Sequence, residues 1–349
     1  MKLYKSGDSY SLFSKFISYI EGKITKKELL ISRKYSNLEF PDTILIGQTN
    51  YCNHNCIMCP NRYIKNKGFM SMDTFLKIIN EAKEYRKHIR RIGFGLFGET
   101  LLHPNIKDFI KIIRNELGDI KIEIGTNATL LNEEMADFLI DYNVNQINIS
   151  FYAIDEESYS IIQGHHPKFF KTTLDNINNF IKKAKNNNKI KIRMAFIPIE
   201  HNKNRWKEYF SQFEKADNLE FDIVRLHKWD DIQNLNKIDK ESIFPTFRYF
   251  KPCIQIDKTI AIDWDGRVVA CCYAWDRPEL IIGNVSNQSI YEIWNGEKFN
   301  SLKKWHETGK SVNFIPCNNC AAHRYEMNFV DSLKYYLYKR KIKNFINKG

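Results

Sequence analysis

The chain has 349 residues, of which 43% are hydrophobic and 27% charged, an ordinary globular composition that suffices for one large core with a smaller appended module. It contains no apolar run near the roughly 20 residues of a membrane-spanning helix and no secretory signal segment, so we expect a cytoplasmic protein. Its net charge of +12 is spread along the sequence, which favours a solvated surface, and no nucleic-acid partner is expected.

Residues 1–40 are predicted to form an N-terminal helical extension, because Phe13, Ile17 and Ile20 recur at helical spacing. From residue 41 onward, β-rich runs alternate with helical ones. Strands are predicted at residues 43–49, 91–97, 119–125, 145–151, 190–198 and 220–226. Between the first two strands, the pattern predicts a helix over residues 71–84 with Ser71 as its cap.

Six strand-helix units in series predict a parallel sheet with right-handed crossovers. The fold class is therefore α/β, and we expect a partial (β/α)6 barrel, similar to part of a TIM barrel, over residues 41–228. In such a fold the functional loops follow the carboxyl ends of the strands.

The strand-helix alternation stops near residue 228. Residues 229–325 are expected to form a second, cysteine-bearing module with short β-like stretches at 259–263 and 267–270. Residues 326–349 mix basic and apolar residues at helical spacing and predict a basic amphipathic C-terminal helix. Such a helix packs on the barrel or touches an anionic membrane surface, and packing is the simpler interpretation.

The eight cysteines fall into two groups, and without an export signal they indicate metal or redox chemistry more than disulfides. Cys52, Cys56 and Cys59 follow the first predicted strand directly. Three thiolates on one loop leave one iron of a [4Fe-4S] cluster open, as a catalytic site requires. A zinc site completed by His54 is disfavoured, because His54 lies inside the tight loop.

This C-x3-C-x-Φ-C spacing, with Met58 as the apolar residue, resembles the signature of the radical S-adenosylmethionine (SAM) superfamily. The sequence at residues 97–100, Phe-Gly-Glu-Thr, resembles that family's Gly-Gly-Glu-Pro turn, although two of its four positions differ. The resemblance implies that Glu99 accepts the SAM ammonium group in a charge-assisted hydrogen bond. It also implies that Asn127 and Ser150, at the ends of the third and fourth strands, contact SAM, with Met58 beside the cofactors.

The resemblance implies the reaction as well. A [4Fe-4S] cluster, reduced by a flavodoxin- or ferredoxin-type partner, passes an electron to the sulfonium of SAM. Methionine is released, and the 5'-deoxyadenosyl radical abstracts hydrogen from a substrate. The cofactors supply this chemistry, and the protein orients the radical and excludes water and oxygen. We therefore expect a radical SAM oxidoreductase.

The second cysteine group has the spacing C-x12-G-x4-C followed by C-x2-C, which resembles the SPASM region of radical SAM enzymes in its single-cluster "twitch" form. The resemblance implies an auxiliary [4Fe-4S] cluster bound by Cys253, Cys271, Cys317 and Cys320. A structural zinc ribbon is the alternative. The remaining thiol, Cys272, is a buried bystander, a ligand in place of Cys271, or a catalytic hydrogen-atom donor.

The substrate is expected to be a small sugar- or polyol-like molecule, or a carrier-bound one, which is oxidised with help from the auxiliary cluster. This expectation rests on the 42 residues before the first strand, which leave no room for the peptide-recognition domain common in peptide-modifying relatives. Peptide or protein side-chain modification by the same chemistry is the alternative. Outside enzymology, the alternative is a basic iron-sulfur module that binds nucleic acid or a membrane.

Overall fold

The computed structural model describes residues 29–30, 35–223, 248–250, 253, 255–272, 274, 277–310, 317, 324–326, 340–342 and 344–346. A nine-stranded sheet runs through the described part of the chain in the order β11-β10-β9-β2-β3-β4-β5-β6-β7. The six predicted barrel strands are β2 (Thr43–Ile46), β3 (Arg91–Phe94), β4 (Lys121–Thr126), β5 (Gln146–Ile149), β6 (Lys191–Phe196) and β7 (Leu219–Ile223). Each pairs in parallel with the next, which confirms the predicted partial barrel.

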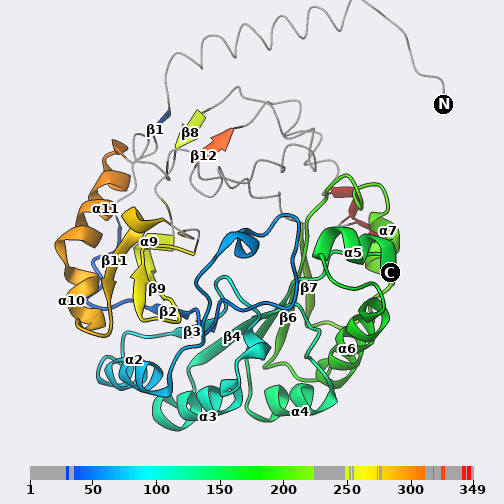
Figure 1. Cartoon of the computed structure of the whole chain (residues 1–349), viewed down its shortest axis with the longest axis horizontal. Coiled ribbons are helices and arrows are strands. Elements are labelled where there is room, and N and C mark those ends of the chain that lie inside the picture. Colours follow the sequence, from blue (N-terminus) through cyan, green and yellow to red (C-terminus); the bar gives the residue numbers. More distant parts are fainter. Residues whose placement is uncertain are drawn as a thin grey trace, which may run out of the picture.

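Helices follow the strands, and α2, α3, α4 and α6 lie along the outer side of the strand arc (Figure 1). The barrel helices are α2 (Met72–Glu84), α3 (Ile106–Leu117), α4 (Glu133–Asp141), α5 (Glu156–Gln163), α6 (Phe169–Ala184) and α7 (Trp206–Ser211). Helix α2 begins after Ser71, whose hydroxyl accepts a hydrogen bond from the Thr74 amide at 3.1 Å. The predicted helix and its cap are therefore both present.

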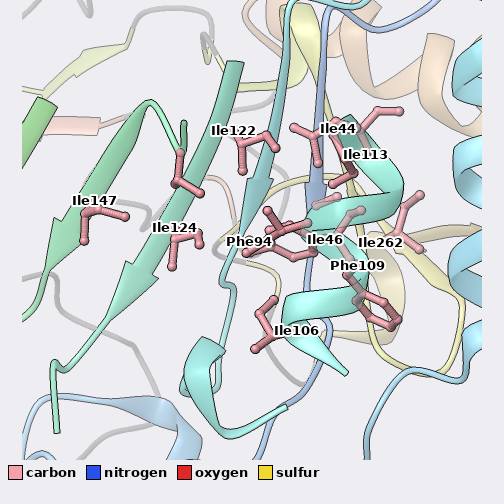
Figure 2. Close-up of a cluster of buried hydrophobic side chains, with 14 of the residues drawn as sticks. Ile44, Ile46, Phe94, Ile106, Phe109, Ile113, Ile122, Ile124, Ile147 and Ile262 are labelled. Atoms are coloured by element: carbon pink, nitrogen blue, oxygen red, sulfur yellow. The ribbon is translucent and has the colours of Figure 1, made fainter. Parts of the chain in front are cut away.

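The core lies between the strands and these helices. Figure 2 shows Ile46 of β2 and Phe94 of β3 packed with Phe109 of α3, and all three are at most 2% exposed. Each such buried side chain stabilises the fold by about 1.5–3 kcal/mol. Because side chains alternate along a strand, the residues between these apolar ones face the barrel interior.

Three strands that follow the barrel in sequence extend its sheet. They are β9 (Thr259–Ile262), β10 (Arg267–Val269) and β11 (Ile281–Asn284), and the first two coincide with the predicted β-like stretches. β9 pairs in parallel with β2 along its whole length, from Thr43 opposite Thr259 to Ile46 opposite Ile262. The strands of the cysteine-bearing region therefore continue the barrel sheet at its β2 edge.

Two helices after β11 attach this region to the barrel. They are α10 (Ile290–Asn295) and α11 (Glu297–Glu307). The Glu81 carboxylate of α2 accepts hydrogen bonds from the Ile290 and Tyr291 amides, both at 2.7 Å, at the amino end of α10. The remaining elements are α9 (Gln255–Lys258), the short helical turns η1 (Pro60–Tyr63), η2 (Thr100–Leu102) and η4 (Pro278–Leu280), and a small sheet of β1 (Leu29–Leu30), β8 (Arg248–Phe250) and β12 (Arg324–Glu326).

Four strands end earlier than predicted, β2 and β3 by three residues and β5 and β6 by two. β3 stops at Phe94, because the next residue, Gly95, has a φ of +117°, which a strand does not accommodate. β2 stops at Ile46, where the chain turns into the loop that carries the first cysteines. Both strands therefore give way to loops that begin at a glycine.

The two ends of the chain are described unequally. Within the predicted N-terminal helical extension, residues 29–30 form β1 and residues 35–40 contain no helix, and the rest of the extension lies outside the described residues. Of the predicted C-terminal helix, residues 340–342 and 344–346 are described and are helical. Ile342 is fully buried, and the Phe345 ring meets Trp206 of α7 at a centroid distance of 5.4 Å. This part of the tail therefore packs on the barrel. Within the described residues, no helix combines the length and the apolar character that crossing a membrane requires.

Candidate active site

The loop that carries the first three cysteines leaves the carboxyl end of β2 and is fixed against α5. The Asn55 amide donates to the Gln163 carbonyl at 3.1 Å, and the Ile57 amide donates to the Ile162 carbonyl at 3.0 Å. Gly164, which ends α5 with a φ of +58°, lies so close that a Cβ there would stand 2.1 Å from the Asn55 carbonyl oxygen. The loop path is therefore set by backbone contacts that do not involve the thiols.

The three thiols are half-buried, and Cys56 packs against an apolar cluster of Met58, Ile162 and Ile199. Burial raises the pKa of each thiol, that of Cys52 to about 11, and neighbouring thiols raise the pKa of Cys56 further. Metal ions are therefore the natural counter-charge for ionised thiolates at this site. Among the described residues, no three His, Cys, Asp or Glu side chains converge closely enough for one metal ion. Thiolates are the usual ligands of iron-sulfur clusters, and three of them lie on this one loop.

His54 points away from the cysteines. Its Nε2 lies 3.1 Å from the Tyr159 hydroxyl, and its Nδ1 lies 3.2 Å from the Gln163 amide nitrogen. Burial, followed by the neighbouring His165, lowers the pKa of His54 to about 3. Both ring nitrogens are thus engaged within the protein, which argues against the zinc site completed by His54.

Glu99 follows β3 and is buried, with 2% of its surface exposed. Its carboxylate accepts hydrogen bonds from the Thr126 hydroxyl and the Asn127 amide, both at 2.6 Å, and from the Leu101 amide at 3.0 Å. Burial raises the pKa of Glu99, and these three hydrogen bonds oppose the rise. The carboxylate therefore joins the carboxyl ends of β3 and β4.

Gly98 allows this turn to approach the cysteine loop. A Cβ at residue 98 would stand 2.2 Å from the Thr49 carbonyl oxygen and 2.8 Å from that of Tyr51. The next amide, that of Glu99, donates to the Tyr51 carbonyl at 2.8 Å. Two departures from the family's Gly-Gly-Glu-Pro turn therefore leave the close backbone approach intact, because Gly98 and Glu99 are both retained.

Asn127 and Ser150 lie at the same end of the sheet as Glu99. The Asn127 side-chain amide donates to Asn53 Oδ1 at 2.7 Å and lies 3.9 Å from Cys52 Sγ. Ser150 is exposed, and its amide donates to the Thr126 carbonyl at 2.8 Å. The loops after β3, β4 and β5 thus bring Glu99, Asn127 and Ser150 to the mouth that holds the cysteine loop.

Two further polar residues of this mouth, Asn53 and Tyr152, were not predicted from the sequence. Asn53 links the cysteine loop to Asn127 and also donates to the Thr129 hydroxyl at 2.8 Å. Only its place between two cysteines marks it in the sequence. Tyr152 follows β5, lies beside the apolar cluster, and has its pKa raised to about 12, chiefly by burial.

In the second cysteine group, Cys253 is buried, and its carbonyl accepts a hydrogen bond from the Tyr35 hydroxyl at 2.9 Å. Burial is the main cause of the raised pKa of Tyr35. The thiols of Cys253 and, more weakly, Cys317 raise it further, so both thiols lie near one phenol. Cys271 packs against the barrel core, and Cys272 beside it is half-buried. Cys320 lies outside the described residues, so the four-thiol ligand set stays a prediction.

Comparison with known families gives two matches. The profile of the radical SAM superfamily matches residues 46–209, and that of the SPASM iron-sulfur cluster-binding domain matches residues 253–321. Together they include all eight cysteines.

Two characterised relatives resemble the chain over most of its length. The tungsten-containing aldehyde ferredoxin oxidoreductase cofactor-modifying protein of Pyrococcus furiosus is 23% identical over 78% of this chain and 85% of its own. The S-adenosyl-L-methionine-dependent 2-deoxy-scyllo-inosamine dehydrogenase of Niallia circulans is 21% identical over 79% of this chain and 91% of its own.

Solved structures share the fold. BtrN in complex with AdoMet and 2-DOIA superposes with a TM-score of 0.56 at 18% identity, covering 83% of this chain and 94% of BtrN. The enzyme anSMEcpe with bound AdoMet and the Cp18Cys peptide gives a TM-score of 0.59 at 15% identity, covering 88% of this chain and 99% of its own. The architecture described above is therefore that of known SAM-binding barrels.

Proposed function

We propose that this chain, which belongs to the radical SAM superfamily and carries a SPASM iron-sulfur region, oxidises a small sugar- or polyol-like substrate, free or carrier-bound. It is a radical SAM iron-sulfur oxidoreductase, and its cofactors are SAM, a [4Fe-4S] cluster that binds SAM, and an auxiliary cluster. When bound, these groups supply a 5'-deoxyadenosyl radical for hydrogen abstraction and a sink for the remaining electron.

In this proposal, Cys52, Cys56 and Cys59 hold the SAM-binding cluster. Cys253, Cys271, Cys317 and Cys320 hold the auxiliary cluster. The support for the first set is three half-buried thiols on one loop that backbone hydrogen bonds hold against α5. The support for the second set is the matched SPASM region and the common neighbourhood of Cys253 and Cys317 around Tyr35.

Glu99, Asn127 and Ser150 are proposed to hold SAM, with Met58 packed beside it. A carboxylate offers about four acceptor positions, and Glu99 uses three of them within the protein. The remaining position is available to the ammonium group of SAM, and the charge of that group offsets the cost of burying the ionised carboxylate. Thr126 and the Asn127 amide keep the carboxylate oriented while it binds.

The polar inner face of the barrel is the observation that carries the substrate class. Complete barrels fill their interior with branched apolar residues, whereas Glu123, Asn148 and Arg193 occupy interior positions here and are half-buried. Arg193 pairs with Asp222 on the next strand. Gly95 and Gly125 stand side by side near them and present no side chains. Such a face offers donors and acceptors to the hydroxyl or amino groups of a polyol.

The relatives support the same substrate class. One of the curated relatives is named a dehydrogenase of 2-deoxy-scyllo-inosamine, and BtrN was solved with 2-DOIA bound. Because anSMEcpe was solved with a bound peptide, modification of a peptide side chain is the competing function, and the test below includes it.

The proposal predicts that an aminocyclitol or sugar-derived polyol stimulates SAM cleavage by the anaerobically reconstituted protein. With dithionite as reductant, 5'-deoxyadenosine is measured against a panel of such polyols, their phosphates and cysteine- or serine-containing peptides. With the carbinol carbon deuterated, deuterium should appear in 5'-deoxyadenosine, because hydrogen is abstracted from that carbon.

A matched pair of variants sharpens this assay. Arg193→Gln, on the inner face, should raise the polyol concentration needed for half-maximal stimulation roughly tenfold, as expected for losing one charged contact of about 1.4 kcal/mol. Lys182→Gln, which breaks an exposed ion pair with Glu214 outside the barrel, should not. Stimulation by peptides and by no polyol would contradict the proposed substrate class.

Cys271 is proposed as the cluster ligand, and Cys272 is the candidate hydrogen-atom donor only if the reaction is an epimerisation, because the proposed oxidation returns no hydrogen. Cys271→Ala should then lower the iron content by about four per chain, as expected for loss of one cluster, and Cys272→Ala should not. A simple oxidation needs no returned hydrogen, so turnover by Cys272→Ala separates oxidation from epimerisation. The reverse pattern of iron loss would exchange the two roles, and normal turnover of Cys272→Ala would exclude a donor role.

A further inference from the structure

We propose that a small acidic one-electron carrier protein docks on the surface beside the first cysteine loop. This surface, termed the cationic aromatic face, consists of Tyr51, Arg62, Tyr63, Lys65, Lys67 and Phe69. The proposal rests on the proposed function, because a carrier has a role only if the cysteine loop holds a cluster that must be reduced. The step moves one electron: the carrier is oxidised by one electron, the cluster is reduced by one electron, and no bond is made or broken.

The aromatic rings of this face are exposed. Tyr51, Tyr63 and Phe69 retain 41%, 44% and 42% of their surface, and the rings of Tyr51 and Phe69 stack at a centroid distance of 4.9 Å. Exposed aromatic side chains that are clustered, and not scattered singly, are typical of protein interaction surfaces. A tyrosine-rich patch beside a redox site therefore suits a protein partner.

The charge of the face indicates the sign of that partner. Residues 43–72 contain Arg62, Lys65 and Lys67 but no acidic residue. A cavity of about 540 Å³ adjoins the two lysines and is lined by Lys65, Asn66, Lys67, Trp264, Asp265 and Arg267. The one acid of this lining, Asp265, is paired with Arg267 at 2.6 Å. The face therefore presents a net positive surface, and electrostatic complementarity favours an acidic partner.

The face is also rigidly joined to the site. Tyr51 is covalently adjacent to Cys52, and its carbonyl accepts the Glu99 amide at 2.8 Å. The segment that carries Lys65 and Lys67 folds back on the cysteine loop, because the Asn50 side chain donates to the Asn66 carbonyl at 2.8 Å and accepts from the Gly68 amide at 2.9 Å. A carrier docked here would lie beside the cysteine loop. These hydrogen bonds already hold the backbone of the docking surface in place before a partner binds.

The test compares two electron sources. Reconstituted enzyme is mixed anaerobically with a reduced, acidic bacterial flavodoxin or with dithionite, and bleaching of the cluster absorbance is followed by stopped flow at low salt. Lys65→Glu should slow reduction by flavodoxin roughly tenfold, because attractive steering becomes repulsive, and added salt should diminish the difference. Reduction by dithionite should not be slowed. Tyr63→Ser should slow the flavodoxin reaction as well, with less salt dependence.

Lys87→Glu is the matched control. Lys87 is exposed and lies between the end of α2 and the start of β3, at the opposite end of the strands, and the substitution makes the same change in net charge. It should leave both reactions unchanged. Equal slowing by Lys65→Glu and Lys87→Glu, slowing with both reductants, or no slowing would each overturn the docking face. Wild-type protein that binds no cluster, or none that dithionite reduces, would instead overturn the proposed function on which the docking rests.

Discussion

Replacing Cys52, Cys56 and Cys59 together by Ala is expected to abolish SAM cleavage and to remove about four irons per chain, the content of one [4Fe-4S] cluster. The described cysteines of the second group do not lie near this loop. They lie around Tyr35 and after the end of β10. The reconstituted wild-type protein should hold about eight irons and eight sulfides. Iron, sulfide and 5'-deoxyadenosine, measured after anaerobic reconstitution with dithionite and SAM, test the prediction.

The same variant should remain folded. The cysteine loop is held by backbone hydrogen bonds from Asn55 and Ile57 to α5, and these bonds do not involve the thiols. The thermal unfolding midpoint of the metal-free variant should therefore stay close to that of the metal-free wild type. Undiminished 5'-deoxyadenosine from a variant with four irons fewer would contradict the assignment of these cysteines, and eight irons in the variant would place the first cluster elsewhere.

Gly98→Ala is expected to destabilise the protein by about 2–4 kcal/mol and to lower SAM cleavage at least tenfold. The added Cβ would meet the carbonyl oxygens of Thr49 and Tyr51 at 2.2 and 2.8 Å. Both are backbone atoms of the cysteine loop, so neither can yield as a flexible side chain would. Relief of the clash moves Glu99 or Cys52, and either movement disturbs the proposed SAM site. Denaturant unfolding of the metal-free protein and the 5'-deoxyadenosine assay measure the two effects.

Gly118→Ala provides the comparison. Gly118 ends α3 with a φ of +64°, and a Cβ there would meet nothing within 4 Å. Because its ψ is −132°, alanine at this position is strained, and the substitution should cost about 1–3 kcal/mol of stability while leaving SAM cleavage intact. If Gly98→Ala lowered SAM cleavage no more than Gly118→Ala does, the close approach of the turn to the cysteine loop would not matter for activity.

Local sequence patterns were sufficient to predict the barrel and the first cysteine site. Alternation along each strand and the cap at Ser71 are short-range signals, and the spacing of Cys52, Cys56 and Cys59 lies within one loop. The extension of the sheet by β9 was not predictable in this way, because β9 and β2 are far apart in sequence and neither contains a mark of its partner. The bonds of Glu99 to Thr126 and Asn127 also depend on the register between β3 and β4. The ends of β2 and β3 were misjudged because Gly47 and Gly95 continue the hydrophobic runs without continuing the strands.

The pairing of β2 with β9 also constrains the order in which the protein can be made. β2 is among the first barrel strands to emerge from the ribosome, yet all four of its residues lack their second neighbour until residues 259–262 have been translated. During that interval an open strand edge lies beside three reduced thiols, and such edges promote association with other chains. The backbone hydrogen bonds of Asn55 and Ile57 to α5 likewise form only after α5 has been synthesised. Iron-sulfur insertion into a loop of native shape is therefore a late event of biogenesis, which follows translation of most of the chain.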